Sequence, residues 1–171
     1  MTAAKRLKYG GNNMKICQEG ISLIKKFEGC PTDPENGMAR SYRCAANVPT
    51  IGYGSTKYKG QPVVDGMYIS MKEAEELLLH EMKEYEGYIN DMVTVDLKQC
   101  EFSALVCWVF NLGPSNLASS TLLKKLLAKD WSDVPYQMKR WNKVQGQILE
   151  GLVRRREAEA LLFQGKDWTH I

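Results

Sequence analysis

The sequence predicts an α+β fold of two lobes, a small antiparallel sheet lobe and a helical lobe, joined by one long helix. Residues 42–69 combine Tyr, Val, Thr and Ile with repeated Gly, which is typical of short strands joined by tight turns. Residues 71–91 are rich in charged side chains, as expected of a helix that bridges two lobes. Residues 100–112 are mostly apolar, which indicates a helix buried at the centre of the second lobe.

The N-terminal part of the chain predicts a leader, a helix and a loop before the sheet. Residues 1–13 are basic and end in Gly-Gly-Asn-Asn, so we expect a flexible leader there and a single domain over 14–171. Apolar residues recur at helical spacing from Met14 to the Glu28-Gly29 pair, where Gly ends the helix. Turn-forming residues then dominate 30–37. Residues 14–70 should therefore form the N-terminal lobe.

The remaining elements follow from cap and stop signals. Ser70 and Glu73 have the spacing of a capping box and open the inter-lobe helix, about 71–91. Gly113-Pro114 ends the buried helix. Further helices are expected after Ser119-Ser120, after Ser132-Asp133 and over about 152–163. Residues 92–171 should therefore form a helical C-terminal lobe, with a cleft between the lobes.

Composition narrows the possible partners. The net charge of +3 is too small to indicate a nucleic-acid partner, although it allows an anionic polymer. No segment reaches the roughly 18 apolar residues of a membrane span. The N-terminus also lacks the apolar core of a secretory signal. We therefore expect a monomer that starts in the cytoplasm, without a nucleic-acid partner or stable membrane insertion.

The cysteines and histidines do not suggest a metal or cofactor site. The five cysteines form no CxxC pair, and an odd number leaves at least one unpaired in a monomer. The two histidines, His80 and His170, lie far apart in the sequence. We expect reduced thiols, several of them buried as small apolar side chains, and no cofactor.

Three side chains are candidates for chemistry. Glu28 ends the predicted first helix and could act as a general acid, although a solvated Glu is the ordinary alternative. Thr50 could hold a water molecule or could simply be a β-branched strand residue. Cys44, six residues before Thr50, could take part in the chemistry or could be an ordinary half-buried thiol. Asp33 and Glu35 are rival carboxylates, although such residues usually form turns.

A set of motifs runs from about Gly20 to Phe163. It comprises Glu28-Gly29, Tyr42-Arg43-Cys44, Thr50-Ile51-Gly52-Tyr53-Gly54, Phe110-Asn111-Leu112-Gly113, Ser120-Thr121-Leu122-Leu123, Arg140-Trp141-Asn142 and Gly151-Leu152-Val153-Arg154-Arg155-Arg156-Glu157-Ala158-Glu159. Together they resemble phage-type lysozymes of glycoside hydrolase family 24, the endolysins related to T-even and lambdoid phage lysozymes. The resemblance implies a lysozyme-like fold.

The resemblance also implies a catalytic set. The family uses a Glu, then an Asp or Cys, then a Thr, and these fall on Glu28, Cys44 and Thr50. The interval from Cys44 to Thr50 matches the family, whereas the fifteen residues between Glu28 and Cys44 exceed its usual number. The excess lies in the loop 30–41, where added length costs little closure entropy. The family often has His at the position of Ser55.

By the same resemblance, the reaction is hydrolysis of the β-1,4 bond from N-acetylmuramic acid to N-acetylglucosamine in peptidoglycan. Glu28 would protonate the leaving oxygen, and Thr50 and Cys44 would place a water on the opposite face. A covalent intermediate on Cys44 is the alternative. Substrate-binding residues would be Tyr42, Phe110, Asn111 and Thr121. Arg155, or its neighbours Arg154 and Arg156, would pair with Glu28.

The implied role is that of an endolysin, held in the host cytoplasm until a holin opens the membrane. Two alternatives stay open. A peptidoglycan-binding or baseplate module could keep the fold without hydrolysis, because a second carboxylate is missing from the motif. A lytic transglycosylase could work with Glu28 alone and would leave 1,6-anhydro ends.

Overall fold

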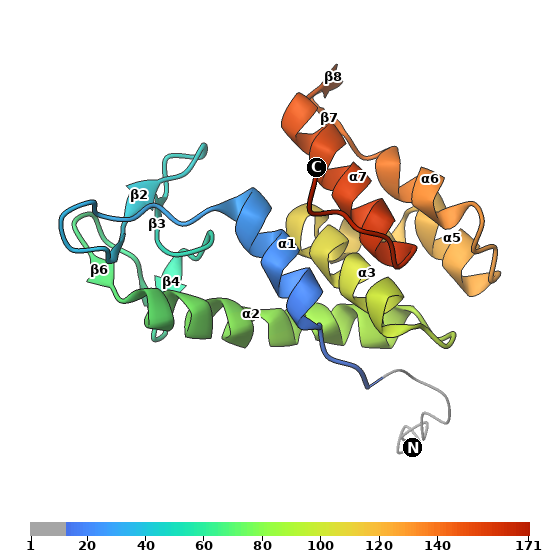
Figure 1. Cartoon of the computed structure of the whole chain (residues 1–171), viewed down its shortest axis with the longest axis horizontal. Coiled ribbons are helices and arrows are strands. Elements are labelled where there is room, and N and C mark those ends of the chain that lie inside the picture. Colours follow the sequence, from blue (N-terminus) through green and yellow to red (C-terminus); the bar gives the residue numbers. More distant parts are fainter. Residues whose placement is uncertain (1–12) are drawn as a thin grey trace, which may run out of the picture.

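The computed structural model describes residues 13–171, so the predicted leader lies outside the described residues except for Asn13. The helices are α1 (Gln18–Glu28), α2 (Met71–Met92), α3 (Gln99–Leu112), α4 (Pro114–Ala118), α5 (Thr121–Leu127), α6 (Val134–Lys139) and α7 (Glu150–Phe163). Figure 1 shows the strands of the N-terminal half gathered at one end of α2 and the helices gathered at the other. The predicted α+β fold with two lobes is confirmed.

The sheet lobe consists of short antiparallel pairs. The strands are β1 (Ala39–Arg40), β2 (Tyr42–Arg43), β3 (Pro49–Thr50), β4 (Lys57–Tyr58), β5 (Gln61–Pro62) and β6 (Tyr68–Ile69). β1 pairs with β6, β2 with β3, and β4 with β5. The strands are short because glycines at positive φ turn the chain between them, as at Gly52 and Gly54. Ala39, Ile51, Val63 and Ile69 form a small core with Ala74 of α2.

Helix α2 serves both lobes, as its polar sequence predicted. The Ser70 hydroxyl accepts from the Glu73 amide at 3.0 Å, and the Glu73 carboxylate accepts from the Ser70 amide at 3.4 Å. The predicted capping box therefore fixes the start of the helix. Ala74 enters the core of the sheet lobe, whereas Leu78 and Met82 enter the core of the helical lobe.

The helical lobe is built around α3. All residues from Glu101 to Val109 are buried, and α3 packs against α1, α2 and α7. At its centre, the Trp108 indole donates to the Met138 carbonyl at 3.3 Å and meets Trp141 edge to face. The apolar run in the sequence therefore correctly predicted the central helix.

The start of α1 differs from the prediction. The helix begins at Gln18 rather than Met14, because residues 14–17 are not helical and their backbone bonds to α2 and α3. The Met14 amide donates to Asn90 Oδ1 at 3.1 Å, and the Ile16 amide donates to Glu86 Oε2 at 2.8 Å. These tertiary partners satisfy the backbone outside a helix.

The lobe boundary also differs from the prediction. Residues 14–70 were expected to form one lobe, but Ile21, Leu23 and Ile24 of α1 pack into the core of the helical lobe. Because α1 presents its apolar stripe to α3 and α7, its C-terminal end is carried by the helical lobe and faces the sheet lobe.

A hairpin before α7 was not predicted. Strand β7 (Lys143–Val144) pairs with β8 (Gln147–Ile148) through Gln145-Gly146, both at positive φ. This is a two-residue hairpin turn, and Gln is an unusual residue at its first position. Helix α7 then starts at Glu150, slightly before the predicted position.

Candidate active site

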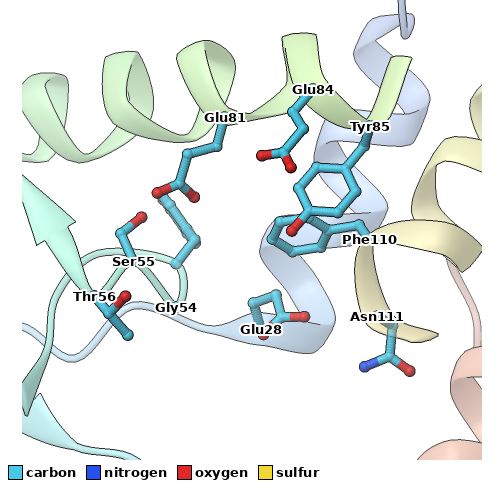
Figure 2. Close-up of a pocket in the computed structure, with 10 residues that line it drawn as sticks. Glu28, Gly54, Ser55, Thr56, Glu81, Glu84, Tyr85, Phe110 and Asn111 are labelled. Carbon is cyan, nitrogen blue, oxygen red and sulfur yellow. The ribbon is translucent and has the colours of Figure 1, made fainter. Parts of the chain in front are cut away.

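A cavity of about 400 Å³ lies between the two lobes. Its wall combines the end of α1, the turn after β3, the middle of α2 and the end of α3 (Figure 2). The lining residues are Glu28, Tyr53, Gly54, Ser55, Thr56, Glu81, Glu84, Tyr85, Phe110 and Asn111. Ligand sites in proteins are commonly clefts of this size between structural units.

Glu28 enters the cavity from the last residue of α1. Its Oε1 accepts a hydrogen bond from Arg155 Nη1 at 2.7 Å, so Arg155 is the one of the three adjacent arginines that pairs with it. Its Oε2 points toward Gly54, where an added Cβ would lie 3.6 Å away. Gly54 has a φ of +103°, which side chains rarely adopt. Arg155 thus holds Oε1 of Glu28, and Oε2 faces the turn at Gly54.

Cys44 directly follows β2, and Thr50 is the last residue of β3, the strand that pairs with β2. Thr50 is 2% exposed, pairs with Tyr42 across the strands, and its hydroxyl lies 2.8 Å from the Val48 carbonyl. Hydrogen bonds with the backbone of Val48 and Ala46 lower the pKa of the Cys44 thiol, and the Thr50 hydroxyl adds to this effect. The thiol therefore has nearby groups that stabilise its anion without any cation.

Tyr42 connects this pair with Glu28 electrostatically. Burial raises the pKa of the Tyr42 phenol, and the charges of Glu28, Cys30 and Cys44 raise it further. Such coupling requires Tyr42 to lie within range of both Glu28 and Cys44. Tyr42 also lies opposite Thr50 in the β2–β3 pair, and of Glu28, Tyr42, Cys44 and Thr50 only Glu28 lines the cavity.

The other predicted substrate-binding residues divide into two groups. Phe110 and Asn111 line the cavity, and the Phe110 ring packs edge to face on Tyr85 with centroids 5.0 Å apart. Thr121 is the exposed first residue of α5 and is not part of the cavity wall. Its role in binding stays a prediction.

Sequence reasoning missed the wall contributed by α2. Glu81, Glu84 and Tyr85 follow the i, i+3, i+4 spacing that places side chains on one helical face, and all three project toward the cavity in Figure 2. Burial raises the pKa of Glu81, while a hydrogen bond with Ser55 opposes the rise. The i, i+3, i+4 spacing of these residues is visible in the sequence, but only the fold shows which face of α2 lines the cleft.

The rival carboxylates in the loop 30–41 are outside the cavity. Asp33 Oδ1 accepts from the Glu35 amide at 2.8 Å, and Oδ2 accepts from the Tyr68 hydroxyl at 3.1 Å. The bond from the Glu35 backbone is the main reason that the pKa of Asp33 is lowered. Asp33 therefore holds a turn.

Neither a metal cluster nor a membrane-crossing helix is found in the described part of the chain. Within residues 13–171 no three His, Cys, Asp or Glu side chains lie together in a way that could hold a metal ion. The helices of the same range are too short or too polar to cross a bilayer.

Comparisons with known proteins agree with this architecture. The phage lysozyme family model matches residues 25–159. An endolysin of Acyrthosiphon pisum secondary endosymbiont phage 1 is 34% identical, with 88% of this chain and 99% of that protein covered. An endolysin of Bacillus phage B103 is 38% identical over 88% of this chain, but the chain spans only 54% of its length.

A solved structure extends the likeness to three dimensions. The endolysin from Escherichia coli O157:H7 phage FAHEc1 superposes with a TM-score of 0.80 at 32% identity, covering 90% of this chain and 95% of that one. The two-lobed fold, with carboxyl groups in the cleft between its lobes, is that of the lysozyme-like proteins. Within that class, the chain belongs to the phage lysozyme family.

Proposed function

We propose that this protein is an endolysin, a muramidase that hydrolyses the β-1,4 bond from N-acetylmuramic acid to N-acetylglucosamine in bacterial peptidoglycan and so lyses the host cell. The observation that carries the proposal is Glu28, a carboxyl group in a cleft between two lobes with one oxygen held by Arg155. Membership of the phage lysozyme family supports the same reaction.

Glu28 is the proposed general acid. Arg155 holds Oε1, which leaves Oε2 on the side of the Gly54 turn to deliver a proton to the leaving oxygen of the sugar. A carboxyl held in this way has restricted side-chain rotation, which favours proton transfer to a substrate bound in the cleft.

Cys44 and Thr50 are proposed to place the attacking water on the opposite face, with inversion at the anomeric carbon. A hydroxyl has one proton and two acceptor lone pairs. The single Thr50 proton can be donated to the Val48 carbonyl or toward the Cys44 sulfur, and in either case the Thr50 oxygen can accept a hydrogen bond from water. A lowered pKa increases the thiolate fraction of Cys44, and the thiolate would accept a hydrogen bond from the second proton of the water.

The glycan is proposed to lie along the wall formed by Tyr85, Phe110 and Asn111. Aromatic side chains supply a large apolar surface, and Asn111 supplies polar contacts to the sugar. Tyr42, opposite Thr50 in the β2–β3 pair, and Thr121, at the start of α5, are proposed to contact sugars further along the glycan.

The enzyme is proposed to act as a monomer that stays in the host cytoplasm until a holin admits it to the cell wall. Expression in cells without a holin should leave the protein in the cytoplasmic fraction and the culture intact. Export of the unaided protein, or lysis without membrane disruption, would contradict this route.

The reaction is tested by the loss of turbidity of chloroform-treated Gram-negative cells. Glu28→Gln keeps an acceptor for Arg155 but cannot donate the catalytic proton, so clearing should slow by about 100-fold or more. Glu35→Gln is a matched control, because it removes an exposed carboxyl outside the cavity and should clear cells at the wild-type rate.

Two outcomes would overturn the assignment. If the wild type and Glu28→Gln clear cells equally slowly, the protein is a binding module and the hydrolase proposal fails. If mass spectrometry finds 1,6-anhydro ends on the released fragments, instead of ends that have gained water, the enzyme is a lytic transglycosylase.

A further inference from the structure

A network of buried charged side chains lies on α7 behind the cleft. It consists of Arg155, Arg156 and Glu159 and is called the buried anchor below. Arg155 Nε donates to Glu159 Oε1 at 3.2 Å, and Arg156 Nη2 donates to the same oxygen at 3.0 Å. Arg156 Nε lies 2.8 Å from the other oxygen of Glu159. Arg156 and Glu159 are 0% exposed, and Arg155 is 4% exposed. Glu159 thus joins both guanidinium groups inside the helical lobe.

Both arginines of the buried anchor contact residues of the cavity wall. Arg155 bonds to Glu28, as described above, and Arg156 Nη2 donates to Asn111 Oδ1 at 2.7 Å. Glu28 and Asn111 come from different helices, α1 and α3, yet they share one buried anchor. The anchor connects two surfaces of the cleft.

Stability alone is a poor explanation for the anchor. Two guanidinium groups and two carboxyl groups balance in charge, but their desolvation offsets much of their attraction. Complete burial accordingly raises the pKa of Glu159, although both arginines oppose that rise. A packed apolar core is often at least as stable as such a network. The property that an apolar core could not supply is a fixed orientation for Glu28 and Asn111.

The contact with Arg156 determines which end of the Asn111 amide faces the cleft. A guanidinium group has five N–H donors and no acceptor, so only the carbonyl end of the amide is able to face it. The Asn111 NH₂ group must therefore point away from Arg156. Asn111 is exposed, and within residues 13–171 its NH₂ group has no hydrogen-bond partner. In Figure 2 the amide nitrogen lies on the side of Glu28.

We infer that Arg156 is a positioning residue that fixes the Asn111 amide so that its NH₂ group donates to an acceptor oxygen of the bound sugar. The inference rests on the proposed function in that the ligand is the peptidoglycan glycan. Arg156 does not touch the sugar and acts only through Asn111. Glu159 holds Arg156 in place and at the same time holds Arg155 against Glu28.

A double-mutant cycle in binding tests the inference without depending on turnover. The background is Glu28→Gln, which keeps an acceptor for Arg155. The measurement is the Kd for soluble glycan fragments of purified peptidoglycan, by calorimetry. Asn111→Ala should weaken binding by about tenfold, the loss of one good hydrogen bond. Arg156→Lys should weaken binding when Asn111 is present and have little further effect in the Asn111→Ala protein.

Equal losses from Arg156→Lys with and without Asn111 would overturn the inference, because a general structural role predicts them. Asn111→Asp provides a second test that leaves Arg156 in place. It keeps an acceptor toward Arg156 but removes the donor, so binding should weaken at least as much as in Asn111→Ala. Gln147→Glu, on the exposed hairpin, controls for the added negative charge. Unchanged binding in Asn111→Asp would also overturn the inference.

The two proposals fail in distinguishable ways. If Glu28→Gln still clears cells like the wild type, the catalytic proposal fails, while the binding cycle remains measurable. If Glu28→Gln is inactive and the cycle is additive, the hydrolase proposal stands and only the role of Arg156 is wrong.

Discussion

Cys44 occupies the motif position where a carboxylate would be the usual base. A thiol with an ordinary pKa is mostly protonated at neutral pH, and Arg43 is the cation next to Cys44 in the sequence. The structure commits Arg43 elsewhere, to Asp65 and the Asn47 carbonyl. The thiolate is stabilised instead by hydrogen bonds at the β2–β3 turn. The local chain conformation thus lowers the pKa of the Cys44 thiol without a neighbouring cation.

The two thiols of the sheet lobe should respond oppositely to pH. Hydrogen bonds lower the pKa of Cys44, whereas burial raises the pKa of Cys30. The thiolate is the reactive form, so alkylation of Cys44 should begin at a lower pH than alkylation of a free cysteine, and alkylation of Cys30 at a higher pH. Peptide mass spectrometry after short iodoacetamide pulses across pH 6–10 measures both thiols in one sample.

Cys30 serves as an internal control for Cys44, because both thiols are partly buried and meet the same reagent in one sample. Thr50→Val should reduce the difference by removing one of the groups that stabilise the Cys44 anion. Coinciding pH profiles for the two thiols would contradict the assignment of a stabilised thiolate at Cys44.

At the scale of single elements, α2 contributes both to the cores of the two lobes and to the wall of the cleft. Its first turn is fixed by the capping box, Ala74 closes the core of the sheet lobe, and Glu81 and Tyr85 form one wall of the cleft. Because the helix is continuous, its start sets the rotational position of every later side chain. The cap therefore matters for the site as well as for stability.

Ser70→Ala should lower the free energy of unfolding by about 1 kcal/mol, since the helix loses a hydrogen bond to an otherwise unsatisfied amide. Urea denaturation followed by circular dichroism measures the change. Ser70→Asp is the matched control, because Asp is an equally good cap and should retain the wild-type stability. An equal loss in both variants would show that the hydroxyl cap is not the stabilising feature.

At the scale of the whole molecule, the two lobes have very different cores. The sheet lobe buries five apolar residues, one of them from α2, whereas the helical lobe buries all of α3 from Phe102 to Val109 together with apolar residues from its neighbours. Opening of a part of a protein costs less when it exposes less apolar surface. The sheet lobe, which carries Cys44 and Thr50, should therefore be the less stable half.

Native-state hydrogen exchange should resolve this difference. The Ile51 amide bonds to the Ser55 carbonyl at 2.8 Å in the sheet lobe, and the Leu105 amide lies in the middle of α3. Ile51 should exchange through a local opening with a lower free energy than Leu105, which should exchange only on global unfolding. Equal opening free energies at both amides would indicate a single cooperative unit instead.

The sequence by itself determined most of the long helices and part of the candidate site. Local signals fixed the cap at Ser70, the stop at Gly113 and the buried helix between 100 and 112, because capping, backbone freedom and apolar content act within a few residues. The motif set singled out Glu28, and the structure places it in the inter-lobe cleft.

Only the tertiary structure decided how these parts meet. The sequence could not show that residues 14–17 stay outside the helix, that α1 packs with the helical lobe, or that Arg155 rather than a neighbour reaches Glu28. It also could not show which face of α2 lines the cleft, or that Arg156 orients Asn111. These outcomes depend on contacts between residues far apart in the chain, and no local preference encodes the partner that packing finally supplies.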